Sequence, residues 1–323
     1  GSLLLDIEMG GGIRPGIVRA TGVSEGGKTS CALSFARNFQ KGDKHMVIYI
    51  KAEGRLSPDM IERSGVSTDD SKWFVYKSNV YESVVDFMRH MVQNNPEEYK
   101  YMFIIDSMDA LIPRGDLEKG SDDAVKVAGG SLISSAFLKR MALGLATRGH
   151  ICFMISQVRS KVSINPYAKE DPKLTNASGG NALLHYSDWI LEFQERFNKD
   201  AISTQPNGKG DMLGHWCKIV FRKTPNEKTG TLVKYPIRYG SRDGQSVWVE
   251  YEVVDMLLMW GMATAKGAWV TISDELAEEV EKELGVEFKK QHQGMDNLRK
   301  YFTENQDIGK YLFNKFRNTL KKA

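Results

Sequence analysis

Residues 22–29 read Gly22-Val23-Ser24-Glu25-Gly26-Gly27-Lys28-Thr29, a complete G-x-x-x-x-G-K-[ST] pattern. A strand-like apolar stretch precedes it at residues 17–21, and a stretch typical of a helix start follows from Ser30. In this setting the glycines allow successive backbone N–H groups to face phosphate oxygens, and the helix N-terminus adds partial positive charge. Lys28 is expected to reach the β- and γ-phosphates, and the Thr29 hydroxyl to bind Mg²⁺. Residues 22–30 therefore predict a nucleoside triphosphate site.

The overall composition is that of an ordinary globular protein. The chain has 323 residues, 41% of them hydrophobic and 26% charged, enough for one large domain and a small one. The formal net charge of +3 is too small to imply nucleic acid binding by itself. Cys31, Cys152 and Cys217 lie far apart among apolar residues, without metal-ligand spacing, and are expected to be buried and reduced. No stretch resembles a secretory signal or a membrane span, so we expect a cytoplasmic protein.

Short apolar runs alternate with helical patterns between the phosphate loop and about residue 240. Expected strands lie at residues 46–50, 102–105, 151–155, 189–193, 216–221 and 232–239, and expected helices at 81–94 and 131–148. Near-continuous apolar runs are typical of strands buried on both faces of a parallel sheet. The alternation predicts a doubly wound α/β core. Two long polar stretches, residues 113–130 and 159–180, follow strands and are expected to be functional loops.

The character of the chain changes after about residue 247. A helix is expected from Val253, a short strand at residues 267–270, and then three further helices. From Gly285 to the end, nine Lys and Arg stand against four acids. This basic excess is either a solvated helical face or a weak phosphate-binding patch.

Three polar residues at expected strand ends complete a candidate hydrolytic site. Asp106 follows four apolar residues, which is where an acid orients Mg²⁺ in nucleotide hydrolases. Glu53 also comes just after a strand and is the candidate base that polarises the attacking water, although a solvated loop acid is the alternative. Gln157 follows the strand at residues 151–155, where its amide can hydrogen-bond a γ-phosphate and signal to the loop behind it.

Several motifs occur in a fixed order along the chain. They are residues 9–16 (MGGGIRPG), the phosphate loop, 52–53 (AE), 104–107 (IIDS), 155–159 (ISQVR), 179–183 (GGNAL) and 267–269 (GAW). In content and order they resemble RecA-type recombinases, from about Leu5 to the C-terminus. The resemblance implies a RecA-type P-loop NTPase core at residues 1–246, with a mainly parallel sheet, and a small C-terminal α/β lobe at residues 247–323. It also implies ATP as the nucleotide with Mg²⁺, and DNA recombination and repair as the function.

The resemblance further implies a helical filament on single-stranded DNA that hydrolyses ATP at subunit interfaces and pairs with homologous duplex DNA. By position, residues 113–130 resemble the first DNA-binding loop and residues 159–180 the second. The candidate DNA contacts are Arg159, Lys161, Tyr167, Gly179, Gly180 and Asn181. Backbone amides near the two glycines could take a phosphate, and the tyrosine could stack on bases.

The chain departs from the family pattern near the nucleotide. Met60 stands where an aromatic stacks on adenine, whereas a second aromatic is matched by Tyr239. Of two lysines that the family extends across the interface to the γ-phosphate, Phe221 replaces one and Lys223 remains as the candidate. Lys51 stands where bacterial RecA has an acid.

The chain also departs from the family at its start. Family members begin with a helix and a strand that pack on the neighbouring subunit, but this chain starts almost at the core, and Gly1-Ser2 resembles a protease-cleavage remnant. We therefore expect an N-terminally shortened, divergent member of the family, such as a phage-encoded one, that is a monomer or a weak oligomer in this form.

Two other functions stay open on the sequence. A hexameric helicase or another ring-forming RecA-fold ATPase would share both phosphate motifs and often the catalytic Glu. A non-catalytic, recombinase-like mediator would bind partner subunits without turnover, but the complete set of Lys28, Thr29, Asp106 and Glu53 favours hydrolysis.

Overall fold

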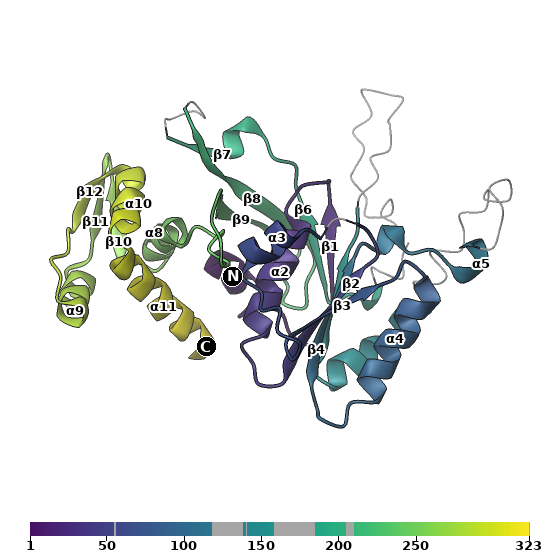
Figure 1. Cartoon of the computed structure of the whole chain (residues 1–323). Coiled ribbons are helices and arrows are strands. Elements are labelled where there is room, and N and C mark those ends of the chain that lie inside the picture. Colours follow the sequence, from purple (N-terminus) through teal and green to yellow (C-terminus); the bar gives the residue numbers. More distant parts are fainter. Residues whose placement is uncertain (55, 118–137, 140, 158–184, 205–209, 323) are drawn as a thin grey trace.

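A central sheet of nine strands carries the larger part of the molecule (Figure 1). The computed structural model describes residues 1–54, 56–117, 138–139, 141–157, 185–204 and 210–322. The sheet order is β3-β2-β4-β5-β1-β6-β8-β7, with β9 also paired to β8. The strands are β1 (Gly16–Gly22), β2 (His45–Lys51), β3 (Trp73–Lys77), β4 (Lys100–Asp106), β5 (Ile151–Ile155), β6 (Trp189–Phe193), β7 (Ala201–Ser203), β8 (Met212–Lys223) and β9 (Leu232–Arg238). From β3 to β6 all neighbours are parallel, and β7, β8 and β9 extend the sheet antiparallel.

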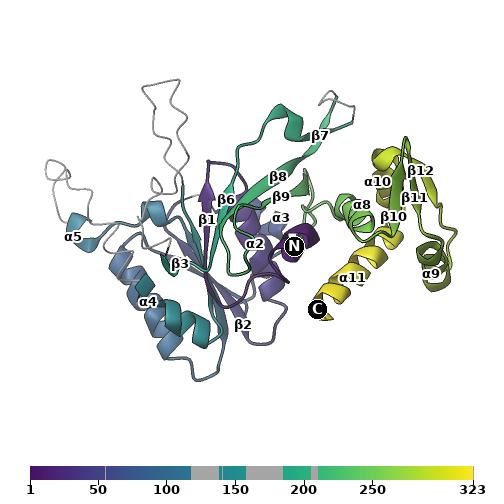
Figure 2. The same ribbon diagram turned by 180° about the vertical axis from the view of Figure 1, so that it is seen from behind.

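Helices cover both faces of this sheet, as the two opposite views show (Figures 1 and 2). On one face, α2 (Lys28–Phe39) and α3 (Pro58–Ser64) pack with side chains such as Val18 and Ile104. On the other face, α4 (Tyr81–Gln93) and the helical residues 141–147 pack with side chains such as Ile105. Strands that are buried on both faces explain the near-continuous apolar runs of the sequence. The structure confirms the predicted doubly wound, mainly parallel α/β fold.

Some elements differ from the sequence-based expectations. The edge strand β3 was not expected, and its burial is mixed, with Trp73 buried and Phe74 47% exposed. The three-residue β7 was also missed, and β8 is longer than the expected strand at residues 216–221. The expected loop at residues 113–130 contains the short helix α5 (Arg114–Leu117), preceded by the 3₁₀ turn η1 (Met108–Ala110).

The C-terminal residues form a smaller body beside the sheet (Figure 1). It contains α8 (Val249–Met259), β10 (Ala263–Lys266), β11 (Trp269–Ile272), α9 (Asp274–Leu284), β12 (Gln291–Gln293), α10 (Gly294–Glu304) and α11 (Gln306–Lys322). The expected helix, short strand and three later helices are all present, with β10 and β12 added in an antiparallel sheet. A separate apolar cluster that includes Phe302, Phe316 and Leu298 fills its interior. The proposed division at residues 246 and 247 stays a prediction.

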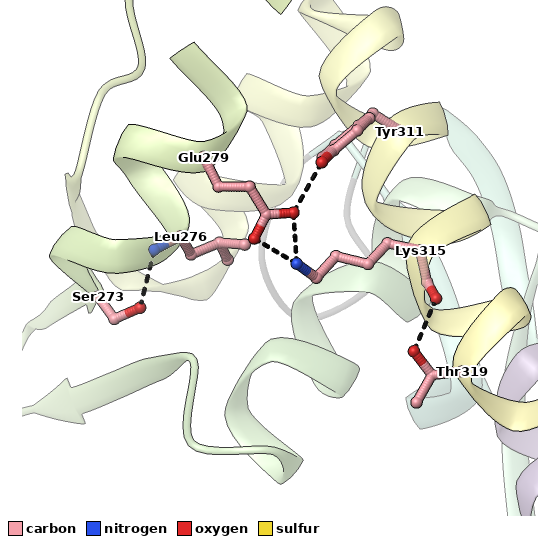
Figure 3. A network of polar contacts seen from close by, with 6 residues as sticks. All are labelled: Ser273, Leu276, Glu279, Tyr311, Lys315 and Thr319. Carbon is pink, nitrogen blue, oxygen red and sulfur yellow. Dashed lines mark hydrogen bonds and ion pairs between the residues drawn. The ribbon is translucent and has the colours of Figure 1, made fainter. Parts of the chain in front are cut away.

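Polar contacts also tie the helices of this lobe together (Figure 3). Ser273 caps α9, since its hydroxyl accepts the Leu276 N–H at 3.4 Å. The Glu279 carboxylate accepts the Tyr311 hydroxyl at 2.7 Å and also pairs with the Lys315 ammonium, joining α9 to α11. These groups are only partly buried, so the apolar cluster contributes most of the lobe's stability.

The first helix, α1 (Leu3–Glu8), joins the two bodies. It packs against β9, α8 and α11, and Leu3 belongs to the apolar cluster of the C-terminal lobe. Ser2 caps α1 and contacts the fully buried Glu252 carboxylate, which also accepts the Leu3 N–H at 3.0 Å. Burial raises the pKa of Glu252 to about 7, because a charged carboxylate is poorly solvated there.

Two further expectations from the sequence concern the cysteines and membrane-spanning segments. The three cysteines are free and buried, as the sequence predicts. Among the described residues, no helix has the length and apolar character that a membrane crossing requires.

Candidate nucleotide site

Loop 22–29 connects β1 to α2 and depends on glycine at two positions. Gly22 has φ +134° and Gly27 has φ +102°, a region that other residues rarely adopt. A Cβ at Gly22 would lie 2.2 Å from the carbonyl oxygen of Phe193 on β6. Gly27 precedes the first residue of α2, so the free N–H groups of the helix start face the inside of the loop. The loop thus has the backbone form that a phosphate group requires.

Lys28 places a buried cation inside this loop. Its side chain is only 7% exposed, and its ammonium donates to the carbonyl oxygens of Gly22 at 3.0 Å and Val23 at 2.5 Å. Carbonyl oxygens stabilise the ammonium next to the helix N-terminus, where the partial positive charge favours an anion. The residues of loop 22–29 therefore fit a nucleotide phosphate.

The Thr29 hydroxyl and the Asp106 carboxylate meet at the ends of α2 and β4. The hydroxyl donates to Asp106 Oδ2 at 3.0 Å, and the buried Tyr49 hydroxyl on β2 donates to the same oxygen at 2.5 Å. Hydroxyl and carboxylate oxygens are the ligands that Mg²⁺ prefers, and in a nucleotide site phosphates and waters supply the others. The described residues contain no group of three His, Cys, Asp or Glu that could hold a metal. This pair fits Mg²⁺ only together with a nucleotide.

Glu53 lies beside Asp106 because β2 and β4 are parallel neighbours. Their register pairs Lys51 with Asp106, and the Asp106 carbonyl oxygen accepts the N–H groups of Ala52 at 3.1 Å and Glu53 at 3.2 Å. The Glu53 carboxylate also accepts a hydrogen bond from the Ser107 hydroxyl. The two acids that the sequence singles out are thus held at one edge of the sheet by backbone and side-chain bonds.

Gln157 lies at the end of β5, next to this edge. Its N–H donates to the Asp109 carboxylate at 2.6 Å, which links β5 to the turn after β4. Beneath it, Arg19 of β1 is 1% exposed and donates to the Ser156 hydroxyl at 3.0 Å. Burial lowers the pKa of Arg19 to about 10, while the nearby Asp109 opposes this shift, so the side chain stays charged at neutral pH. A buried ionic cluster thus supports the position of Gln157.

A cavity of about 360 Å³ opens beside the phosphate loop. Five residues from the sequence-based set line it: Glu25, Gly27, Ser30, Met60 and Tyr239. The structure therefore brings both candidate base contacts to the same hollow as the loop. Tyr239 is 43% exposed and its ring lies 5.4 Å from the ring of His215.

Cysteines and a histidine line other parts of the same cavity. Burial raises the pKa of Cys31 strongly and that of Cys217 to about 11, so both are neutral thiols. Burial lowers the pKa of His215 to about 4, with nearby Arg196 acting in the same direction. The walls of the cavity are thus uncharged at these positions, which suits an uncharged base.

Lys223 does not reach the loop of its own chain. The sheet register places Gly22 beside Phe193, whereas Lys223 lies beside Ile190, three residues along β6. Its ammonium donates to the carbonyl oxygen of His185 at 2.8 Å, and burial lowers its pKa. The register thus places Lys223 away from loop 22–29 of its own chain.

The DNA-contact candidates lie outside the described residues. These are Arg159, Lys161, Tyr167, Gly179, Gly180 and Asn181. The same holds for most of the expected first loop, since the description stops at Leu117 and resumes at Leu138.

The structure adds three residues that sequence reasoning did not identify: Tyr49, Ser107 and Asp109. Tyr49 looked like one apolar member of a buried strand, and no signal in the chain distinguishes it. Ser107 is the last residue of the 104–107 motif and Asp109 lies two residues after it, so their polar character next to a strand end was the available signal.

Comparison with known proteins identifies relatives along nearly the whole chain. A family model described as the RecA N-terminal domain matches residues 1–225. The chain is 27% identical to Protein RecA of Rhodococcus opacus (strain B4) over 310 residues, which is 95% of this chain and 78% of the relative. It is 26% identical to Protein RecA of Mycolicibacterium smegmatis over 322 residues, 99% of this chain and 82% of the relative. The region matched by the family model includes loop 22–29, Glu53, Asp106 and Gln157.

Proposed function

The chain belongs to the RecA family, and from this premise we propose that it is an ATP-dependent recombinase that assembles on single-stranded DNA and exchanges strands with a homologous duplex. The observation that carries the proposal is the meeting of Lys28, Thr29, Asp106 and Glu53 at one edge of the sheet. A site that only binds a nucleotide would not require the Glu53 carboxylate next to Thr29 and Asp106.

In the proposed site, loop 22–29 binds the phosphates through backbone N–H groups and Lys28. When the Lys28 ammonium leaves the carbonyl oxygens of Gly22 and Val23, it can pair with a phosphate of the nucleotide. Thr29 and Asp106 would hold Mg²⁺, which would supply positive charge to the nucleotide phosphates. Met60 and Tyr239 contact the adenine from the walls of the neighbouring cavity.

Glu53 acts as the base that orients and polarises the attacking water. Backbone bonds to the Asp106 carbonyl oxygen fix its position, and the Ser107 hydroxyl holds one oxygen of its carboxylate. The Glu53 carboxylate accepts a proton from the attacking water. Gln157 senses the γ-phosphate from the end of β5 and relays nucleotide state to the loop that follows it.

Assembly would complete the site. Lys223 lies away from its own loop and is proposed to donate to the γ-phosphate of a neighbouring subunit in a helical filament. Residues 113–130 and 159–180 are proposed to hold the DNA, with contacts from Arg159, Lys161, Tyr167, Gly179, Gly180 and Asn181. Single-strand binding should then weaken steeply with added salt, because phosphate contacts release counterions.

The test is steady-state ATP hydrolysis with and without single-stranded DNA, at low and high salt. We expect hydrolysis that rises on addition of single strands and that loses this stimulation as salt increases. Turnover that ignores single-stranded DNA at every salt concentration would contradict the recombinase proposal. Electron micrographs of the same samples should contain helical filaments, and closed rings would contradict it independently.

A further inference from the structure

Tyr49 is a buried phenol in the middle of an apolar strand, and the proposed mechanism gives it no role. It is 1% exposed on β2, between Val47 and Lys51, and its side chain belongs to the apolar layer that contains Val47 and Ile104. A phenylalanine would fill the same space without a polar atom to satisfy. The hydroxyl is therefore the feature that requires an explanation.

The hydroxyl has a specific partner. It donates to Asp106 Oδ2 at 2.5 Å, and the Thr29 hydroxyl donates to the same oxygen at 3.0 Å. Hydrogen bonds to an ionised acceptor are stronger and shorter than neutral ones. Two donors from different elements, β2 and α2, thus fix the orientation of one carboxylate and leave its other oxygen, Oδ1, for further donors such as a metal-bound water.

The ring of Tyr49 is itself held in place. Its centroid lies 5.7 Å from that of Trp73 on the neighbouring strand β3, and both rings belong to the same apolar layer. The strand and its packing restrict the rotamer of Tyr49, so the hydroxyl is held in a fixed position next to Asp106. A group of this kind sets the geometry of a metal ligand without touching the metal.

We propose that Tyr49 is a positioning residue that orients the Asp106 carboxylate for binding of the magnesium–nucleotide complex. The proposal rests on the proposed nucleotide site and assigns a further residue to it. It predicts that removal of the phenol hydroxyl weakens the response to Mg²⁺ by about tenfold, the usual effect of losing a partner of a metal ligand. Metal-free nucleotide binding through loop 22–29 should stay unchanged.

The experiment is a fluorescence titration of a labelled ATP analogue, first in EDTA and then with increasing MgCl₂. The variants are Tyr49→Phe and, as a second residue without a hydroxyl, Tyr49→Met. The matched control is Tyr76→Phe on β3, whose half-buried ring stacks on Phe87 at 4.1 Å. Thermal unfolding of each variant identifies those that fold.

The expected result is a higher Mg²⁺ concentration at half-effect for the folded Tyr49 variants, with wild-type affinity in EDTA and with a wild-type response in Tyr76→Phe. An unchanged Mg²⁺ response in any folded Tyr49 variant would overturn the proposal, as would an equal loss in EDTA and in Mg²⁺. If the wild-type protein did not bind the analogue at all, the proposed nucleotide function itself would fail, which is a separate result.

Discussion

The edge of the sheet that carries loop 22–29 and the C-terminal lobe are stabilised in different ways. At the sheet edge, the key side chains come from different strands and are joined by polar bonds, such as Thr29 to Asp106 and Ser107 to Glu53. In the lobe, an apolar cluster around Phe302 and Phe316 fills the interior, and the bonds that join α9 to α11 through Glu279 are only partly buried. A single substitution at the sheet edge should therefore change ATP binding or hydrolysis, whereas one in the lobe should change the free energy of unfolding.

The largest effect should come from Glu53→Gln. If Glu53 is the base, turnover should fall by roughly 10²–10⁴-fold, the usual contribution of a positioned base. ATP binding should stay near that of the wild type, because the amide keeps the shape of the side chain. The measurement is ATP hydrolysis under saturating nucleotide, with exposed Glu97→Gln as the control. Normal turnover in Glu53→Gln would remove Glu53 from its role.

Phe302→Ala should instead lower the free energy of unfolding and leave ATP binding nearly unchanged. Phe302 is fully buried in the lobe's apolar cluster, so its truncation should cost about 3–5 kcal/mol of the lobe's unfolding free energy. ATP affinity should change little, because loop 22–29 belongs to the other body. Denaturant unfolding and ATP titration together check this, with Met295→Ala, 41% exposed, as the control. A parallel loss of ATP affinity would show that the two regions are not separable.

The buried carboxyls at the contact between α1 and the lobe should make the stability of the protein depend on pH. Burial raises the pKa of Glu252 to about 7 and that of Asp6 to about 6, from ordinary values of 4.5 and 3.8. At these two carboxyls the folded state binds more protons than the unfolded state between about pH 4 and 7, so their contribution to stability should fall as pH rises through that window. The buried His150 and His215, whose pKa burial lowers to about 4, contribute in the opposite direction. Glu252→Gln should remove the Glu252 part of this fall and leave the contributions of Asp6 and of the histidines unchanged. Melting temperatures from pH 4.5 to 8 measure it, and identical slopes in both proteins would contradict the assignment.

The smallest effect should come from Ser107→Ala. Its hydroxyl holds the Glu53 carboxylate, and the loss of one such bond corresponds to about 0.5–1.5 kcal/mol, or roughly two- to tenfold in turnover. The apparent Michaelis constant for ATP should stay unchanged, because the Ser107 hydroxyl donates to Glu53 rather than to the phosphate loop. A loss of ATP affinity with normal turnover would instead place Ser107 in binding.

Much of this fold could be predicted from the sequence because its buried parallel strands are continuous apolar runs and its helices have amphipathic spacing. The site-bearing strand ends could be predicted for the same reason, since Asp106 and Glu53 each interrupt such a run. The edge strand β3 was missed although residues 73–76 form an apolar run, because periodicity does not distinguish so short a run from a segment of buried helix. The role of Tyr49 could not be predicted either, because a tyrosine in an apolar run is indistinguishable from a packing residue until the strand register is known.

The proposed function depends above all on ATP binding at loop 22–29. The most direct test is equilibrium binding of ATP with Mg²⁺ by calorimetry. Wild type should bind at one site per chain, and Lys28→Ala should lose at least tenfold in affinity because the loop loses its buried cation. Lys234→Ala, an exposed lysine in the middle of β9, should bind like the wild type. Equal affinity in Lys28→Ala and wild type, or no binding by wild type, would contradict the account.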